Sequence, residues 1–168
     1  DLPVDGTKVR ILKSVGEEVY AALRDRAGEV VAYWCRHVKP EVRVDADVIN
    51  QPLDVDSPCK LRYSEEGTEI VVGYAARAEP INGYYNRGIT LLEEDAESLV
   101  AFKIDSRYLE HTLTRDNVLR DENYEKAMAK LQELVAKALP AHLFAELERT
   151  RDAELWRLAA SQLREWGG

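Results

Sequence analysis

The 168-residue chain has few of the residues that crosslink small proteins or bind metals. It contains two cysteines, Cys35 and Cys59, and three histidines. The cysteines are too few and too far apart for a disulfide framework or a CxxC pair, and no two histidines have the HxxxH spacing of a metal-binding helix. We therefore expect no metal site, and we interpret His37, His111 and His142 as surface or capping residues.

The chain also lacks an excess of positive charge and any long apolar run. Lys and Arg total 23 against 31 for Asp and Glu, which gives a net charge of -8. Such a protein has no surplus of cations to displace the counterions of nucleic acid. No apolar stretch approaches the ~20 residues needed to span a bilayer, and the first residues do not form a signal peptide. The sequence thus predicts a soluble, cytoplasmic protein that binds neither nucleic acid nor membrane.

Glycine-rich phosphate-binding loops are absent as well. The nine glycines are isolated except for the terminal pair, so neither GxGxxG nor GxxxxGK[ST] occurs. Acidic residues are plentiful, with runs at Glu17-Glu18, Glu65-Glu66 and Glu93-Glu94-Asp95. We expect these runs at turns and helix starts, where water and the helix dipole stabilise negative charge. No set of residues converges on a catalytic centre, which disfavours an independent enzyme.

The hydrophobic period changes along the chain and predicts its elements. Alternation over 7–12 predicts a short strand, and apolar residues at three- and four-residue steps from Val19 to Val38 predict a helix that ends at Pro40, with Gly28 as a potential break. Further strands are predicted at 42–49, 60–63, 68–74, 84–92 and 99–104, with turns at 65–67 and 82–83.

The remainder of the chain is predicted to be helical. An apolar seam runs from Tyr124 to Ala138 and is expected to end near Pro140. One or two closing helices follow, and their apolar residues either bury into the domain core or form an interface; these are Leu155, Leu158, Leu163 and Trp166. The element order favours an α/β fold class, in which helices pack on a mixed sheet and C-terminal helices follow.

The segment 104–121, which joins the last predicted strand to the first of these helices, has the most unusual composition. Thr112 or Thr114 is a good candidate N-cap, and Arg115 would then lie in the first helical turn. A guanidinium is unfavourable there for stability but is well suited to binding an anion such as phosphate. The alternative is an ordinary ion pair between Arg115 and an acidic neighbour, of which there are three: Asp116, Asp121 and Glu110.

Four short segments, taken together, carry a further signal; they are Gly6-Thr7-Lys8-Val9-Arg10-Ile11-Leu12, Val42-Arg43-Val44, Tyr85-Asn86-Arg87-Gly88-Ile89 and Leu113-Thr114-Arg115-Asp116. In order, they resemble motifs around the middle domain of GHKL ATPases of the heat shock protein 90 (HtpG) family and its short bacterial relatives. The first resembles the glycine-threonine strand that closes the preceding ATPase domain, and the second the entry into the middle domain. The third resembles the family's tyrosine-x-arginine-arginine strand, and the fourth its serine-arginine-glutamate stretch.

This resemblance implies a fold and a division of the chain. The fold would be the ribosomal-protein-S-five-domain-two-like layer. Residues 1–14 would be the end of a preceding ATPase domain or a linker strand, 15–140 the middle or transducer domain, and 141–168 a C-terminal helical extension. The parent protein would be a chaperone of the stress response, with client proteins and a homodimer among its expected partners.

The resemblance also implies a role for Arg115. In the family, an arginine of the middle domain reaches the γ-phosphate of ATP, which is bound with Mg²⁺ by the preceding domain. Arg115 matches that arginine, and Asn117 is the nearest polar residue that would offer a second contact, because Leu119 stands where the family has glutamine. The chain would then supply one catalytic arginine without a complete active site of its own.

Two other interpretations stay open at this stage. In the first, the chain is a protein-interaction module without any link to nucleotide, and Arg115 would tolerate replacement by alanine. In the second, the chain belongs to a different GHKL branch, such as a mismatch-repair or topoisomerase subunit. The acidic charge disfavours the second alternative, because those proteins approach DNA.

Overall fold

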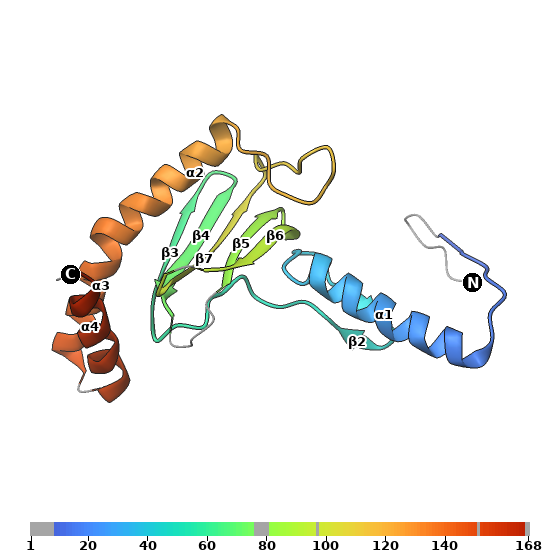
Figure 1. Cartoon of the computed structure of the whole chain (residues 1–168), viewed down its shortest axis with the longest axis horizontal. Helices are drawn as coiled ribbons and strands as arrows, with labels where there is room; N and C mark the ends of the chain where they lie inside the picture. Colours follow the sequence, from blue (N-terminus) through green and yellow to red (C-terminus); the bar gives the residue numbers. More distant parts are fainter. Residues whose placement is uncertain (1–8, 76–80, 97, 151, 167–168) are drawn as a thin grey trace.

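We describe a computed structural model of the chain that places residues 9–75, 81–96, 98–150 and 152–166. A long helix precedes the strands, and a helical run follows them (Figure 1). The elements are α1 (Glu17–Cys35), β1 (Arg43–Val44), β2 (Asp47–Val48), β3 (Cys59–Glu65), β4 (Thr68–Tyr74), β5 (Ile81–Asn86), β6 (Ile89–Asp95), β7 (Val100–Ser106), α2 (Glu122–Glu133), a π-helical segment η1 (Leu134–Ala138), α3 (Leu139–Arg149) and α4 (Ala153–Trp166).

Five strands form one mixed sheet in the order β3-β4-β7-β5-β6. Neighbouring strands are antiparallel except β5 and β7, which run parallel with Tyr85 opposite Asp105. Because β5 and β7 end at the same edge, the turn after Asn86 and the long segment after Ser106 both leave from that edge. The predicted class, α/β with helices packed on a mixed sheet, is confirmed at this level.

Alternation along the strands gives the sheet two different faces. On one face, strand residues such as Ile70, Val72 and Ile104 form the main core with α2, η1, α3 and α4. On the other face a smaller apolar cluster, which includes Val71 and Tyr85, is covered by the loop that carries Leu53 and Val55. The C-terminal end of α1 also contacts this second face, whereas its N-terminal part extends beyond the sheet (Figure 1).

The predicted first helix is confirmed as α1, but it does not break at Gly28. A Cβ atom at that position would lie 3.4 Å from the Val44 side chain, an ordinary van der Waals distance, so the small β1-β2 hairpin packs beside the helix there. The predicted strand at 42–49 is in fact this hairpin of two short strands.

Two other predictions differ from the structure. Of the strand predicted at 7–12, Thr7 and Lys8 lie outside the described residues, and residues 9–12 form no strand and are exposed, because no described strand lies beside them to pair with. Asn82-Gly83 is not a turn but part of β5, and the strand predicted at 84–92 is interrupted by the turn at Arg87-Gly88, where both residues have positive φ. Gly83 is required for packing instead, since a Cβ there would overlap the Tyr85 ring.

The helical run does not end near Pro140, as the sequence predicted. It continues from α2 through η1 into α3, with Pro140 in the first turn of α3. Proline has no N–H and its ring clashes with the carbonyl four residues earlier in an α-helix, and the wider π-helical turn before it relieves that clash. Leu155 and Leu158 are buried in the main core, so this part of the predicted helical extension packs on the domain. The side chains of Leu163 and Trp166 lie outside the described residues.

Candidate functional site

The segment between β7 and α2 forms a hairpin-like loop, which we call the 107–121 loop. His111 and Val118 are bridge partners, and the Thr112 N–H donates to the Asn117 carbonyl at 2.9 Å. At the tip, the Arg115 N–H donates to the Thr112 carbonyl at 3.0 Å, and Arg115 has φ of 57°. Backbone hydrogen bonds thus give the tip a defined shape, with Arg115 in the left-handed conformation that few residues other than glycine adopt.

The predicted helix start at Arg115 is wrong. The helix begins at Glu122, and Asp121 is its N-cap, accepting from the backbone N–H groups of Asn123 and Tyr124 at 2.9 and 3.0 Å. An aspartate caps a helix as well as threonine does, so the N-cap preference of Thr112 and Thr114 did not decide where α2 begins.

The ion pair proposed as the alternative role of Arg115 is not formed. Arg115 is exposed and makes no ion pair with any described residue. Asp121 caps α2, and the Asp116 carboxylate accepts hydrogen bonds from the hydroxyls of Thr112 and Thr114. The hydrogen bonds from Thr114 and Thr112 lower the pKa of Asp116, which is therefore ionised near neutral pH while it orders the tip.

Asn117 lies two residues further along the same tip. Its Oδ1 accepts from the Val118 N–H at 2.8 Å, and its amide nitrogen makes no hydrogen bond within the described part of the chain. The tip therefore brings Arg115 and the Asn117 amide into one exposed turn. Leu119 is half exposed and offers no polar group.

Buried side chains at its base anchor the 107–121 loop to the domain. Leu109 and Val118 belong to the main core. Asn86, at the end of β5, donates to the Leu109 carbonyl at 2.5 Å, and the His111 ring lies 6.1 Å from the Trp34 ring of α1. The base thus contacts both the sheet and α1, and the tip projects beyond the sheet edge (Figure 1).

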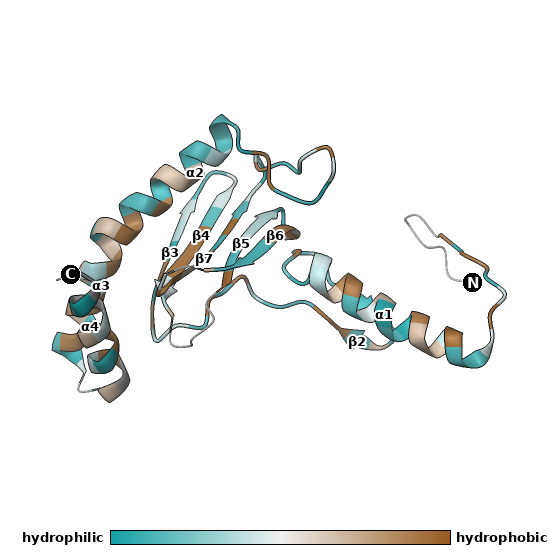
Figure 2. Ribbon diagram, viewed as in Figure 1, coloured by the Kyte–Doolittle hydropathy of each residue, from teal (hydrophilic) through white to brown (hydrophobic). Residues whose placement is uncertain are grey.

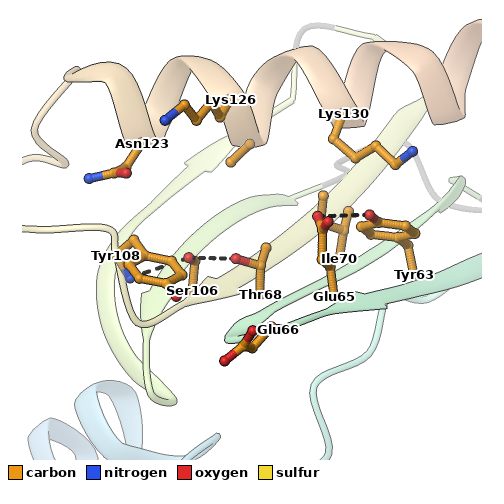
Figure 3. Close-up of a pocket in the computed structure, with 11 residues that line it drawn as sticks. Tyr63, Glu65, Glu66, Thr68, Ile70, Ser106, Tyr108, Asn123, Lys126 and Lys130 are labelled. Carbon is orange, nitrogen blue, oxygen red and sulfur yellow. Dashed lines mark hydrogen bonds between the residues drawn. The ribbon is translucent and has the colours of Figure 1, made fainter.

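A pocket of about 400 Å³ lies between the first turns of α2 and the β3-β4 hairpin. Figure 3 shows Asn123, Lys126 and Lys130 on its helix side, opposite the strands. Thr68 and Ser106 hydrogen-bond to each other at 2.8 Å on the strand side. The lining also includes Glu65 and Glu66, so its two glutamates balance its two lysines, and no catalytic arrangement results.

The second face of the sheet carries a partly buried polar cluster, which we call the Arg36–Lys103 cluster; its members are Arg36, His37, Tyr85, Glu93 and Lys103. The Glu93 carboxylate accepts hydrogen bonds from the Arg36 guanidinium and the Tyr85 hydroxyl. Burial alone would raise the pKa of Glu93, but these two hydrogen bonds, together with the positive charges of Arg36 and Lys103, outweigh it and lower the pKa. Glu93 is thus ionised and fully engaged.

His37 and Lys103 form the other half of this cluster. His37 Nδ1 lies 3.0 Å from the Gln51 carbonyl, and its Nε2 lies 3.0 Å from Lys103 Nζ. Burial lowers the pKa of both His37 and Lys103. Lys103 also lies 5.8 Å from the centroid of the Tyr85 ring and makes no ion pair with any described carboxylate.

Sequence reasoning missed the Arg36–Lys103 cluster. His37 is buried, and not the surface or capping residue that was predicted. Glu93 lies within β6 and faces Arg36, and is not at a turn. One signal was present, because a charged residue at Lys103 interrupts the otherwise apolar strand 99–104. Its partners come from three other parts of the chain, which local patterns do not bring together.

Across the described residues, no group of three or more histidine, cysteine, aspartate or glutamate side chains is placed to hold a metal ion. No helix in the described ranges is long and apolar enough to cross a bilayer. No protein-family model matches the chain, and no curated protein matches it.

Proposed function

We propose that the chain is the middle, transducer domain of an HtpG-like GHKL ATPase, with the ribosomal-protein-S-five-domain-two-like fold. In this proposal Arg115 reaches the γ-phosphate of ATP held, with Mg²⁺, by an N-terminal ATPase domain of the same protein. The observation that carries the proposal is the state of Arg115. It is an exposed arginine on an ordered tip, and the nearby carboxylates of Asp116 and Asp121 are engaged elsewhere.

The chemistry of a guanidinium suits this role. Its planar fork donates two parallel hydrogen bonds to phosphate oxygens, and it remains charged at any physiological pH. An arginine supplied from a second domain stabilises the charge on the transferred phosphoryl group only when the domains dock. Hydrolysis would then be coupled to domain geometry. The Asn117 amide, on the same turn, would donate a further hydrogen bond.

The exposed apolar surface near the N-terminal end supports contact with another domain. Six large apolar residues of 9–23 are exposed: Val9, Ile11, Leu12, Val19, Tyr20 and Leu23. α1 has no buried residue, and Figure 2 shows apolar positions along the part of α1 that extends beyond the sheet. In the proposal the preceding ATPase domain covers this surface. Client proteins and a second copy of the protein would be further partners.

Hydrogen exchange tests the proposal in the complete gene product. The backbone amides of Thr112, Arg115 and Leu119 should exchange with solvent more slowly when a non-hydrolysable ATP analogue is bound than when ADP is bound. The reason is that docking of the tip on the γ-phosphate would shield these amides from water. The amides of α3 serve as an internal control and should not change. Equal exchange at the tip in both nucleotides would contradict the proposal and favour an interaction module without nucleotide coupling.

A further inference from the structure

We propose that Lys103 is an acyl-acceptor site, at which the side-chain amine reacts with a small activated acyl group of the acyl phosphate class. The inference concerns the face of the sheet opposite the main core and does not depend on the proposed function. It starts from the contact between Lys103 Nζ and His37 Nε2, which are 3.0 Å apart.

The direction of that hydrogen bond follows from the other side of the imidazole. His37 Nδ1 lies 3.0 Å from the Gln51 carbonyl oxygen, which only accepts hydrogen bonds, so Nδ1 carries the proton. In the neutral ring Nε2 then has a lone pair that faces Lys103. Lys103 therefore donates to His37, and His37 is placed to take a proton from the ammonium group.

Burial favours the amine form of Lys103. It lowers the pKa of Lys103, and the charge of Arg36 acts in the same direction. The charges of Glu93 and Asp54 oppose this shift. Arg36 and Lys103 carry two positive charges against the single negative charge of Glu93, whose carboxylate is occupied by Arg36 and Tyr85. The Arg36–Lys103 cluster therefore retains one positive charge that would attract an anionic donor.

A pocket beside Lys103 provides room for a donor. Lys103 and His37 line a pocket of about 430 Å³ whose opposite side is the loop 51–57 together with Lys60. Asp54, which also lines this pocket, pairs with Lys60 at 2.5 Å. The pocket is large enough for an acetyl or similar small acyl group, and too small for a protein segment to enter deeply.

The reaction is a simple acyl transfer. The Lys103 ammonium gives one proton to His37 Nε2, and the lone pair of the resulting amine attacks the acyl carbon. An N–C bond forms, the C–O bond to phosphate breaks, and phosphate leaves with the bonding electrons and the second amine proton. His37 then releases its proton to water. No group is oxidised or reduced, and the product is an amide that has lost the positive charge of Lys103.

Competitive acetylation of the native protein tests the inference. The complete gene product is treated briefly with acetyl phosphate near neutral pH, and the acetylated fraction of each lysine is measured by peptide mass spectrometry. Lys103 should react at least about threefold faster than Lys126 and Lys39, which are exposed, because more of it is present as the amine. In urea the three rates should become equal. Equal or slower reaction of Lys103 in the native protein would overturn the inference.

The role of His37 is tested separately. His37→Gln keeps a hydrogen-bond acceptor near Lys103 but removes the proton acceptor, so the rate at Lys103 should fall below that of the wild type. His142→Gln, on α3, is the matched control and should leave the rate at Lys103 unchanged. An unchanged rate in a folded His37→Gln protein would overturn the assignment of His37. If that variant does not fold, the native and unfolded wild-type rates still decide whether Lys103 is an acceptor site.

Discussion

Replacing Glu93 by glutamine tests whether the Arg36–Lys103 cluster is an integral part of the fold. The substitution preserves size and leaves an amide oxygen for the Tyr85 hydroxyl. It removes the negative charge that the Arg36 guanidinium contacts, so that Arg36 would have no carboxylate partner among the described residues.

The expected loss follows from the burial of the pair. Removing one partner of a fully buried ion pair costs about 3–5 kcal/mol, because a charge is left without compensation. The Arg36 side chain is 22% exposed and that of Glu93 11%, so water partly resolvates the guanidinium. We therefore expect Glu93→Gln to lower the free energy of unfolding by about 2–3 kcal/mol.

Urea unfolding of the two proteins at neutral pH measures this difference. The matched control is Glu69→Gln, which breaks the more exposed Arg62–Glu69 pair on the same sheet, with side chains 48% and 34% exposed. That change should cost no more than about 1 kcal/mol. A similarly small loss for Glu93→Gln would refute the reasoning.

Acidification provides a second check on Glu93. The pKa of Glu93 is lowered in the folded state. Its contribution to the free energy of unfolding is therefore complete above the ordinary pKa of 4.5 and is lost as the pH falls through the lower folded pKa. The difference in stability between wild type and Glu93→Gln should therefore stay constant from neutral pH to about 5 and narrow below 4.5. If the difference in stability between the two proteins widened in acid, the pKa of Glu93 would not be lowered by folding.

Three further predictions concern the backbone and the 107–121 loop. Gly88→Ala should destabilise the fold by at least about 2 kcal/mol in thermal unfolding, because φ of Gly88 is 82° and the new Cβ would lie 2.2 Å from the His37 carbonyl oxygen. An unchanged stability would show that this turn relaxes freely. Asp121→Ala should cost about 1 kcal/mol in urea unfolding, through loss of the α2 N-cap, and no loss would mean that water caps the helix equally well. Asp116→Ala should lower ATP turnover of the complete gene product severalfold without moving the unfolding midpoint, because the hydroxyls of Thr112 and Thr114 lose their shared hydrogen-bond acceptor. Turnover equal to that of the wild type would show that ATP hydrolysis does not need an ordered tip.

Local patterns predicted those elements whose stability is largely local. The three- and four-residue spacing of apolar residues identified α1 and the seam of α2. The α2 seam packs on the main core, whereas α1 has no buried residue. The β3-β4 hairpin was predicted from Glu66-Gly67, and Gly67 has the positive φ that such a turn requires. The coarse α/β class followed from the order of these elements.

Features that depend on tertiary contacts were not predicted. Asn82-Gly83 has the composition of a tight turn, yet the sheet places it inside β5, where the small residue makes room for Tyr85. Pro140 was expected to end a helix, but packing of Leu139 and Leu143 on the core favours continuation through a π-helical turn. At the candidate site the sequence identified Arg115, while its loop conformation follows from hydrogen bonds to residues on both sides of the tip.

Steady-state ATP turnover of the complete gene product tests whether Arg115 acts on the γ-phosphate of ATP. Wild type is compared with Arg115→Ala and with a control in the same loop, Arg120→Ala, whose guanidinium lies over the Tyr124 ring. We expect Arg115→Ala to lower kcat by ~10-fold or more, equivalent to about 1.4 kcal/mol of barrier, with ATP affinity nearly unchanged, while Arg120→Ala retains turnover. Unchanged turnover in Arg115→Ala, or the absence of any ATPase activity in the wild type, would contradict this role of Arg115.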